Sequence, residues 1–324
     1  MLSTPRRSAT MEKRLLGRSD LRITKVGVGT APMGSSPEWR VYWGPQDEQA
    51  AIRAIHTALD EGVNWIDTAP FYGWGRAEEI VGKAIKDRRK EVYIFTKCGT
   101  MPDGKGGSFE NLKPESIKRE VDASLKRLQI DYIDLLQFHD VDATTPIEES
   151  WTALQGLVKE GKLRYGGLSN HPVPLIERAM KIAPVVANQV QYNPLKRRAE
   201  KDIMPFSLKH QIGVLGWGSL AEGFLADTFD IEKLDAKDFR RKHWYSAPEN
   251  SAKMLKVRET FARIARSRGK KMVDIVIAWE LMNPALTGAI VGIRNEKEAR
   301  ELRDGTEIVL TREEMQEIDK VTAA

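Results

Sequence analysis

The chain has 324 residues, of which 41% are hydrophobic, so it can build a sizeable core without disulfide or metal staples. Its net charge is +5, but basic and acidic residues are interleaved, and the densest basic cluster (266–271) is better explained as a helix end capped by Gly269 than as a nucleic-acid patch. No apolar run approaches the roughly 20 residues of a membrane span, and Cys98, as the only cysteine, can form no internal disulfide, which fits a reducing, cytoplasmic location.

The first ten residues, MLSTPRRSAT, carry two arginines with no apolar stretch behind them, so they are not a signal peptide. We predict that residues 1–10 are a disordered extension and that residues 11–324 form a single domain. The next stretch, KRLLGRSDLRITKV, is typical of a β-hairpin that turns near residues 17–20. Such a hairpin could plug the bottom of a barrel.

Eight β-like runs follow, and helical segments separate them. An alternation of strand and helix without any strand-only block predicts a parallel sheet, and eight units suit closure into a (β/α)8 TIM barrel. An open doubly wound sheet is the alternative, but GVGTAPMG at 27–34 lacks the glycine spacing of its phosphate loop. The predicted strands are 25–32, 64–69, 92–99, 132–140, 163–170, 184–193, 213–220 and 287–293.

The helical segments carry one apolar stripe each. Ile117, Val121, Leu125 and Leu128 recur at helical spacing, as expected for a helix with one buried face. The same spacing recurs in the segment that begins at Ile147. Near the end of the chain, a capping box formed by Thr311 and Glu314 predicts an extra C-terminal helix over 312–320.

Three neighbouring predicted strands end in polar side chains: Asp67, Lys97 and His139. In a barrel, catalytic residues lie at the carboxyl ends of the strands, and adjacent strands are only about 4.8 Å apart. We therefore expect these three side chains to form one patch, over which Tyr72 folds from its loop. Each residue alone is more often structural, but the joint occurrence on three strand ends favours a catalytic site.

The chemistry of this patch follows from the pairing of charges. A buried lysine needs a counter-charge, which Asp67 supplies, and the ammonium of Lys97 should then lower the pKa of Tyr72. A tyrosine poised in this way can donate a proton to a substrate oxygen that His139 holds. Cys98, on the opposite face of the strand, is predicted to be a core residue. No metal site is predicted.

These residues resemble the motifs of the aldo-keto reductases over essentially all of residues 12–320. DTAPFYGWGRAEEIVGKAI carries the Asp and Tyr motif, FTKCG the lysine, LLQFHDVD the histidine, and PIEESWTALQGLVKEGKLRYGGLSN leads to a Ser-Asn pair. The chain is most similar to the bacterial and archaeal branches near the potassium-channel β-subunits. The resemblance implies an oxidoreductase that binds an extended nicotinamide dinucleotide without a Rossmann domain.

The resemblance also implies roles for individual residues. Tyr72 would be the general acid, Lys97 and Asp67 would tune it, and His139 would orient the carbonyl. Ten residues would bind the cofactor, from the nicotinamide carboxamide to the adenosine end: Ser169, Asn170, Gln189, Trp217, Ser219, Leu220, Gly223, Gly292, Arg294 and Glu298. The chain departs from the family pattern at Ala226-Asp227, where a Gly-Lys pair is frequent, at Glu298, where Gln or Arg is usual, and at Leu302, where Asn is usual.

We expect NADP(H) to be favoured as the cofactor, with NAD(H) as the alternative. Arg294 and the helix start behind it could converge on the ribose phosphate, with Lys297 within reach. Glu298 opposes this, because an acidic residue can instead bind a bare ribose.

We expect a carbonyl or alcohol substrate, and small aldehydes, sugars and larger ketones all remain open. Five aromatic residues are candidates for its pocket: Trp43, Phe71, Trp74, Trp244 and Tyr245. Two other functions compete with the reductase. One is a non-catalytic redox sensor or channel accessory, and the other is a lyase that uses Lys97 as a Schiff-base nucleophile.

Overall fold

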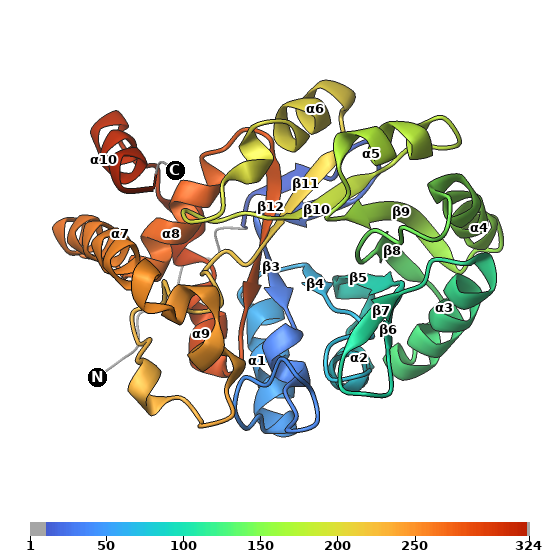
Figure 1. Cartoon of the computed structure of the whole chain (residues 1–324), viewed down its shortest axis with the longest axis horizontal. Helices are drawn as coiled ribbons and strands as arrows, with labels where there is room; N and C mark the ends of the chain where they lie inside the picture. The colour runs from blue at the N-terminus through green and yellow to red at the C-terminus, as the bar shows by residue number, and fades with distance from the viewer. Residues whose placement is uncertain (1–10, 323–324) are drawn as a thin grey trace.

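The structure is a computed structural model that describes residues 11–322, and its centre is a closed barrel of eight parallel strands in the order β3-β4-β5-β8-β9-β10-β11-β12. The order in the barrel is the order in the chain, so the predicted (β/α)8 architecture is confirmed (Figure 1). The strands are β3 (Val26–Gly29), β4 (Trp65–Asp67), β5 (Tyr93–Cys98), β8 (Ile133–Phe138), β9 (Leu163–Ser169), β10 (Ala187–Gln191), β11 (Gly213–Trp217) and β12 (Leu286–Gly292).

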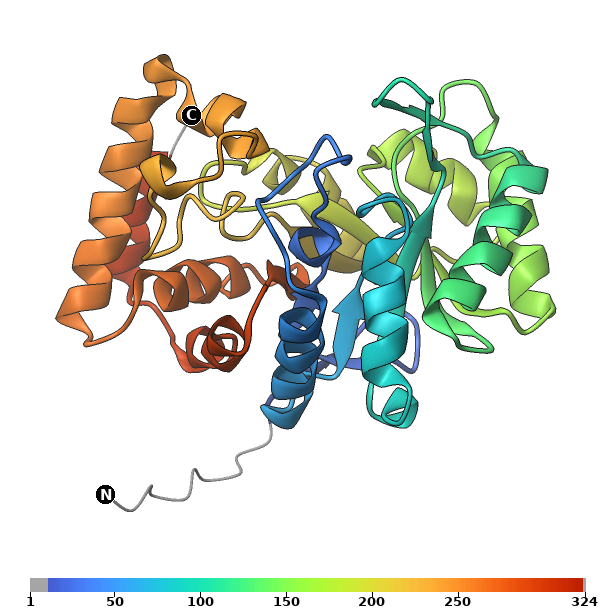
Figure 2. The same ribbon diagram turned by 90° about the horizontal axis from the view of Figure 1, so that it is seen from below.

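Ten α-helices lie among the described residues, and Figure 2 shows them around the barrel. Eight of them follow a barrel strand, while α7 and α10 are additional and pack against each other, with the Arg268 guanidinium paired to the Glu314 carboxylate at 2.5 Å. The helices are α1 (Glu48–Asp60), α2 (Arg76–Ile85), α3 (Pro114–Leu128), α4 (Ile147–Lys159), α5 (Val173–Met180), α6 (Ile203–His210), α7 (Pro248–Ser267), α8 (Met272–Leu281), α9 (Glu296–Glu301) and α10 (Arg312–Thr322).

The predicted local signals are present in the structure. In α3, Ile117, Val121 and Leu128 are fully buried, because a stripe at helical spacing faces the barrel. The capping box is formed at α10, where the Thr311 backbone N–H donates to Glu314 at 2.7 Å. The basic cluster lies at the end of α7, and Gly269 there has a positive φ of 61°.

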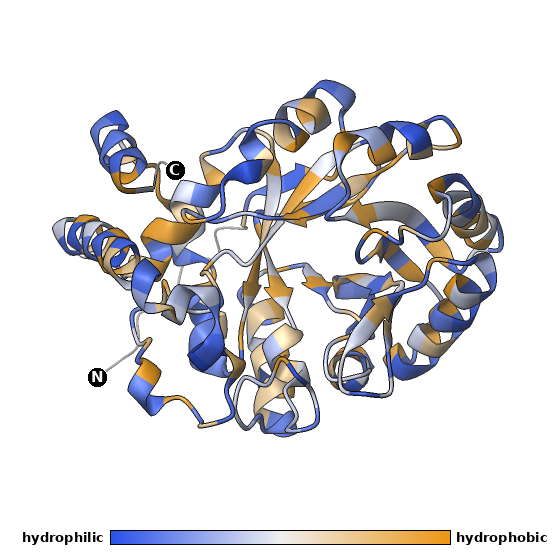
Figure 3. Ribbon diagram, viewed as in Figure 1, coloured by the Kyte–Doolittle hydropathy of each residue, from blue (hydrophilic) through white to orange (hydrophobic). Residues whose placement is uncertain are grey.

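The hydrophobic core has two parts. The larger part fills the layer between the strands and the helices, and Figure 3 shows the apolar residues gathered on the strands and the inward helix faces. The smaller part lies within the barrel, where the Trp65 ring fits against Gly27: a Cβ on that glycine would lie 2.2 Å from the indole.

The N-terminal hairpin closes the barrel at the end opposite the polar strand ends. It consists of β1 (Lys13–Leu15) and β2 (Arg22–Thr24), paired antiparallel. Leu16, Leu21 and Ile23 are fully buried and join the cluster inside the barrel. The predicted plug is therefore present. Residues 1–10 lie outside the described residues.

A second hairpin was not predicted. Strands β6 (Thr100–Pro102) and β7 (Ser108–Glu110) pair antiparallel directly after β5. Among the described residues, no helix is both long and apolar enough to cross a bilayer.

Candidate active site

The structure brings Asp67 and Lys97 together at the carboxyl ends of β4 and β5. Both side chains are about 1% exposed, and the Lys97 Nζ lies 2.5 Å from Asp67 Oδ1. The ammonium also donates to the Thr68 carbonyl at 3.0 Å and to the Tyr72 hydroxyl at 3.1 Å. All three protons of the lysine therefore have an acceptor, which is the condition for keeping a charged lysine in the interior.

Asp67 has two further partners. Its Oδ2 accepts hydrogen bonds from Gln189 Nε2 at 2.7 Å and from Gln137 Nε2 at 3.3 Å. Gln137 was not identified from the sequence, although it lies beside Lys97 in the register of β5 and β8. The carboxylate is thus fixed from three strands, and it fixes the lysine in turn.

Tyr72 is positioned by close backbone packing. It lies on the turn after β4, and a Cβ on Gly34 would come within 2.6 Å of the Tyr72 carbonyl oxygen. Only glycine at 34 allows the residues after β3 to approach this turn so closely. His139, directly after β8, completes the group, with its ring centre 5.9 Å from that of Tyr72.

The protonation states of the four groups are set by burial and by Lys97. Burial alone would lower the pKa of Lys97, but Asp67 and Tyr72 outweigh it, and the net pKa is raised. Burial raises the pKa of Tyr72, and Lys97 offsets only part of that rise. The expectation that Lys97 brings the pKa of Tyr72 below its usual value is therefore wrong, because burial destabilises the phenolate by more than the Lys97 ammonium stabilises it.

His139 is neutral near pH 7, because burial and the nearby Lys97 ammonium hold its pKa well below the usual value. At this pH the site thus combines an ammonium, a protonated phenol and a neutral imidazole. Because the Tyr72 oxygen accepts from Lys97, the phenol proton stays available for donation elsewhere.

A cavity of about 930 Å³ opens above the strand ends, and Asp67, Tyr72 and His139 line it. All ten predicted cofactor residues also line this cavity, although they come from four different strand ends and the loops behind them. The structure therefore brings the predicted set together. Their individual roles remain predictions.

The residues that were expected to hold the nicotinamide also contact one another and the catalytic residues, which the sequence did not indicate. The Asn170 amide donates to the His139 carbonyl at 3.2 Å and accepts from the Trp217 indole at 3.0 Å. The amide thus orients Trp217, while Gln189 orients Asp67. By contrast, the buried hydroxyl of Ser169 has no partner among the described residues, as expected for a group that waits for a ligand.

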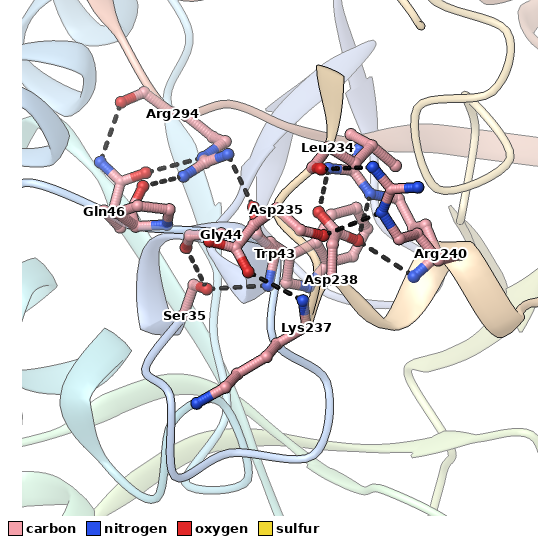
Figure 4. A network of polar contacts seen from close by, with 12 residues as sticks. Ser35, Trp43, Gly44, Gln46, Leu234, Asp235, Lys237, Asp238, Arg240 and Arg294 are labelled. Carbon is pink, nitrogen blue, oxygen red and sulfur yellow. Dashed lines mark hydrogen bonds and ion pairs between the residues drawn. The ribbon is translucent and has the colours of Figure 1, made fainter. Parts of the chain in front are cut away.

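Arg294 has other partners than the predicted phosphate. Its guanidinium donates to Gln46 Oε1 at 2.9 Å, to the Trp43 carbonyl at 2.9 Å and to the Pro45 carbonyl. Figure 4 shows the side chain reaching from the end of β12 to this loop. Arg294 therefore ties the loop before α1 to the barrel, and the phosphate contact stays a prediction.

Two of the five predicted pocket aromatics, Trp43 and Phe71, line the cavity. The other three do not: Trp74 packs edge-on behind Phe71, Tyr245 is only 2% exposed, and Trp244 lies outside with 43% of its surface exposed. Trp39 was missed. Its ring packs against Phe71 at 5.4 Å and Tyr72 at 6.2 Å, so it forms the wall next to the proposed acid. Its segment has no periodicity from which this could be inferred.

Together these observations define an α/β-barrel enzyme with a buried Asp–Lys pair, a tyrosine and a histidine at the floor of one large cavity. The comparison with known families agrees with this. The model of the Aldo/keto reductase family matches residues 25–323, and the chain belongs to this family.

Several known proteins are similar to nearly the whole chain. The chain is 33% identical to the aldo-keto reductase YhdN of Bacillus subtilis (strain 168), over 96% of this chain and 93% of the relative. It is 32% identical to the NADH-specific methylglyoxal reductase of Escherichia coli (strain K12), over 90% and 92% of the two chains. Among solved structures, a glycerol dehydrogenase from Gluconobacter oxydans superposes with a TM-score of 0.86 at 34% identity, covering 96% and 95%. The chain is therefore an oxidoreductase.

Proposed function

We propose that the protein reduces aldehydes or ketones, or oxidises the corresponding alcohols, with Tyr72 as the general acid. One observation carries this proposal: Tyr72 lines the cavity, and its hydroxyl oxygen accepts from the Lys97 ammonium at 3.1 Å, which leaves the phenol proton free to be donated to a substrate. A nicotinamide dinucleotide bound in the cavity supplies the hydride. The residues of this chain then have to hold the carbonyl oxygen and protonate it.

Each of the four polar residues has a distinct part in that task. The neutral His139 imidazole can donate a hydrogen bond to the carbonyl oxygen and so place it against the Tyr72 hydroxyl. Lys97 stabilises the phenolate that forms when the proton leaves, because its positive charge lies 3.1 Å from the oxygen. Asp67 keeps Lys97 charged and in place.

The cavity fits a dinucleotide in its size and in its polar groups. Trp217 presents an indole fixed by Asn170, and the Ser169 hydroxyl lacks a partner among the described residues. We propose that Ser169, Asn170 and Trp217 hold the nicotinamide, and that the turn from Ser219 to Gly223 lies along the phosphates. The other expected cofactor contacts, Gln189, Gly292, Arg294 and Glu298, line the same cavity.

The sequence favours NADP(H) through Arg294, with NAD(H) as the alternative, and one relative is an NADH-specific methylglyoxal reductase. The substrate class proposed is small carbonyl compounds. It is consistent with relatives named for methylglyoxal and glycerol and with aromatic walls formed by Trp39, Trp43 and Phe71. The single cysteine fits action in the cytoplasm.

The geometry weakens the two competing functions. A Schiff-base lyase needs an uncharged lysine, whereas Lys97 is paired with Asp67 and its pKa is raised. A non-catalytic sensor does not need the complete set of Asp67, Tyr72, Lys97 and His139.

A panel of aldehydes, ketones and polyols, assayed by the absorbance of NADH and NADPH, tests the proposal. We expect turnover with at least one small carbonyl compound. Dinucleotide binding without turnover across the panel would favour the sensor, and borohydride trapping of substrate on Lys97 would favour the lyase.

A further inference from the structure

We propose that the cavity is built for NAD(H) rather than NADP(H), because the carboxylates of Asp227 and Glu298 line the end where a ribose 2′-phosphate would have to bind. The inference rests on the proposed function, in which the cavity holds a nicotinamide dinucleotide with its adenosine end near Arg294. It replaces the preference that the sequence indicated. Four observations on the side chains at this end support it.

The first observation concerns Arg294, the cation that the sequence assigned to the phosphate. Of its five N–H groups, three already donate to acceptors on the loop before α1: the Gln46 side chain and the carbonyls of Trp43 and Pro45 (Figure 4). A bidentate contact with a phosphate would require the guanidinium to release part of that loop. Arg294 is thus a positioning residue for the loop that carries Trp43.

The second observation concerns Asp227, which departs from the Gly-Lys pair of the family pattern described above. Its Oδ1 accepts from the Met272 N–H at 2.8 Å, and its Oδ2 accepts from the Val273 N–H at 3.1 Å. These N–H groups begin α8 and would otherwise be free to bind an anion. Asp227 lines the cavity, so it puts a negative charge in the place where a phosphate would find donors.

The third observation concerns Glu298, which also lines the cavity. Its Oε2 accepts from the Arg294 N–H at 2.7 Å, and its Oε1 accepts from Asn295 Nδ2 at 2.8 Å. Each carboxylate oxygen can accept a second hydrogen bond. Glu298 can therefore accept from a ribose hydroxyl, as acidic residues do in NAD sites, but it repels a 2′-phosphate.

The fourth observation is the balance of charge. Five lysines and arginines line the cavity, and four have partners: Lys233 pairs with Asp230, Arg240 with Asp238, and Lys271 with Glu301, while Arg294 holds the loop. Of these five side chains, only Lys297 has neither an ion pair nor a hydrogen-bond acceptor within residues 11–322. One exposed lysine is a weak counter-charge for a phosphate dianion that also faces Asp227 and Glu298.

Equilibrium binding tests the inference without relying on turnover. Quenching of tryptophan fluorescence gives the dissociation constants of NADH and NADPH, because Trp217 lines the cavity. We expect the wild-type protein to bind NADH at least about tenfold more tightly than NADPH, a difference of about 1.4 kcal/mol. Asp227→Asn and Glu298→Gln keep the shape of the side chain and remove its charge. Each should tighten NADPH binding by roughly three- to tenfold. Asp227→Asn should change NADH binding by less than about twofold, whereas Glu298→Gln should weaken it, because an amide oxygen accepts from a ribose hydroxyl less strongly than a carboxylate does.

Glu296→Gln is the matched control. Glu296 lies in the same turn as Glu298 but pairs with Arg53 and Arg300 and does not line the cavity, so both dissociation constants should stay unchanged. Wild-type preference for NADPH, or no gain in NADPH binding by either charge-removing variant, would overturn the inference and leave the proposed function intact. If neither dinucleotide quenches the fluorescence, the proposed function itself fails.

Discussion

Replacing Asp67 by asparagine removes the counter-charge of Lys97 and keeps the shape of the side chain. The ammonium then has only the Thr68 carbonyl, the Tyr72 hydroxyl and a neutral amide as partners. Breaking a buried ion pair by removing one partner costs about 3–5 kcal/mol. Lys97 can avoid this cost by losing its proton. At pH 7, removing the proton from a lysine whose unperturbed pKa is near 10.4 costs about 1.36 kcal/mol for each of 3.4 pH units. The loss in the free energy of unfolding therefore cannot exceed roughly 4.6 kcal/mol.

This upper limit falls as the pH rises, so the destabilisation caused by Asp67→Asn depends on pH. In the folded wild-type protein the pKa of Lys97 is raised above its value in the unfolded chain. The stabilisation from its charge is therefore fully present below the pKa of the unfolded chain, and it is lost only as the pH rises through the pKa of the folded protein. In Asp67→Asn burial dominates and depresses the pKa of Lys97 in the folded state. The variant should therefore gain stability from pH 7 to pH 9, where the upper limit falls to roughly 1.9 kcal/mol.

Urea unfolding followed by tryptophan fluorescence at pH 7 and pH 9 measures this difference. The double variant Asp67→Asn/Lys97→Met is the control, since it removes both charges and should be more stable at pH 7 than Asp67→Asn alone. If Asp67→Asn loses the same stability at both pH values, or if the double variant is no more stable than the single one, an unpaired Lys97 charge is not the cause of the loss.

Two further predictions follow from the cavity. Trp39→Phe should raise the KM for the carbonyl substrate by roughly fivefold, because an aromatic contact is worth about 0.5–1.5 kcal/mol. Trp244→Phe, outside the cavity, should leave the KM unchanged, and equal effects of both variants would show that the pocket lies elsewhere. Alcohol oxidation needs the Tyr72 phenolate, and the pKa of Tyr72 is raised, so the rate of oxidation should rise by about tenfold per pH unit between pH 7 and 9. The rate of carbonyl reduction should stay nearly constant over this range, and a pH-independent oxidation rate would contradict the protonation state assigned to Tyr72.

The barrel and the catalytic group could be predicted because their signals are local. Each strand is a short apolar run. Asp67 and Lys97 lie at the carboxyl ends of two of them and His139 directly follows a third, so the topology alone brings the three residues to the same rim. The strand bounds were predicted slightly too long, because polar residues after a strand, such as Asn170, continue the pattern but belong to the loop.

The partners of long-range side chains could not be predicted in the same way. Arg294 contacts a loop that lies 248 or more positions earlier in the chain, and no pattern in the sequence marks Gln46 or Pro45 as its acceptors. Asp227 departs visibly from the family pattern, but only the structure shows that its carboxylate caps α8. The pKa of Tyr72 was predicted in the wrong direction because the charge of Lys97 is evident in the sequence and the extent of burial is not.

The variant Tyr72→Phe shows whether Tyr72 supplies the proton. The variant loses only the hydroxyl, and Lys97 keeps Asp67 and the Thr68 carbonyl as partners, so folding and dinucleotide binding should persist. Steady-state kinetics of carbonyl reduction measure turnover, and fluorescence quenching on the same preparation measures dinucleotide binding. Carbonyl turnover should fall by at least about 100-fold, while the dissociation constant of the dinucleotide should change by less than about twofold. Carbonyl reduction near the wild-type rate would show that another group supplies the proton.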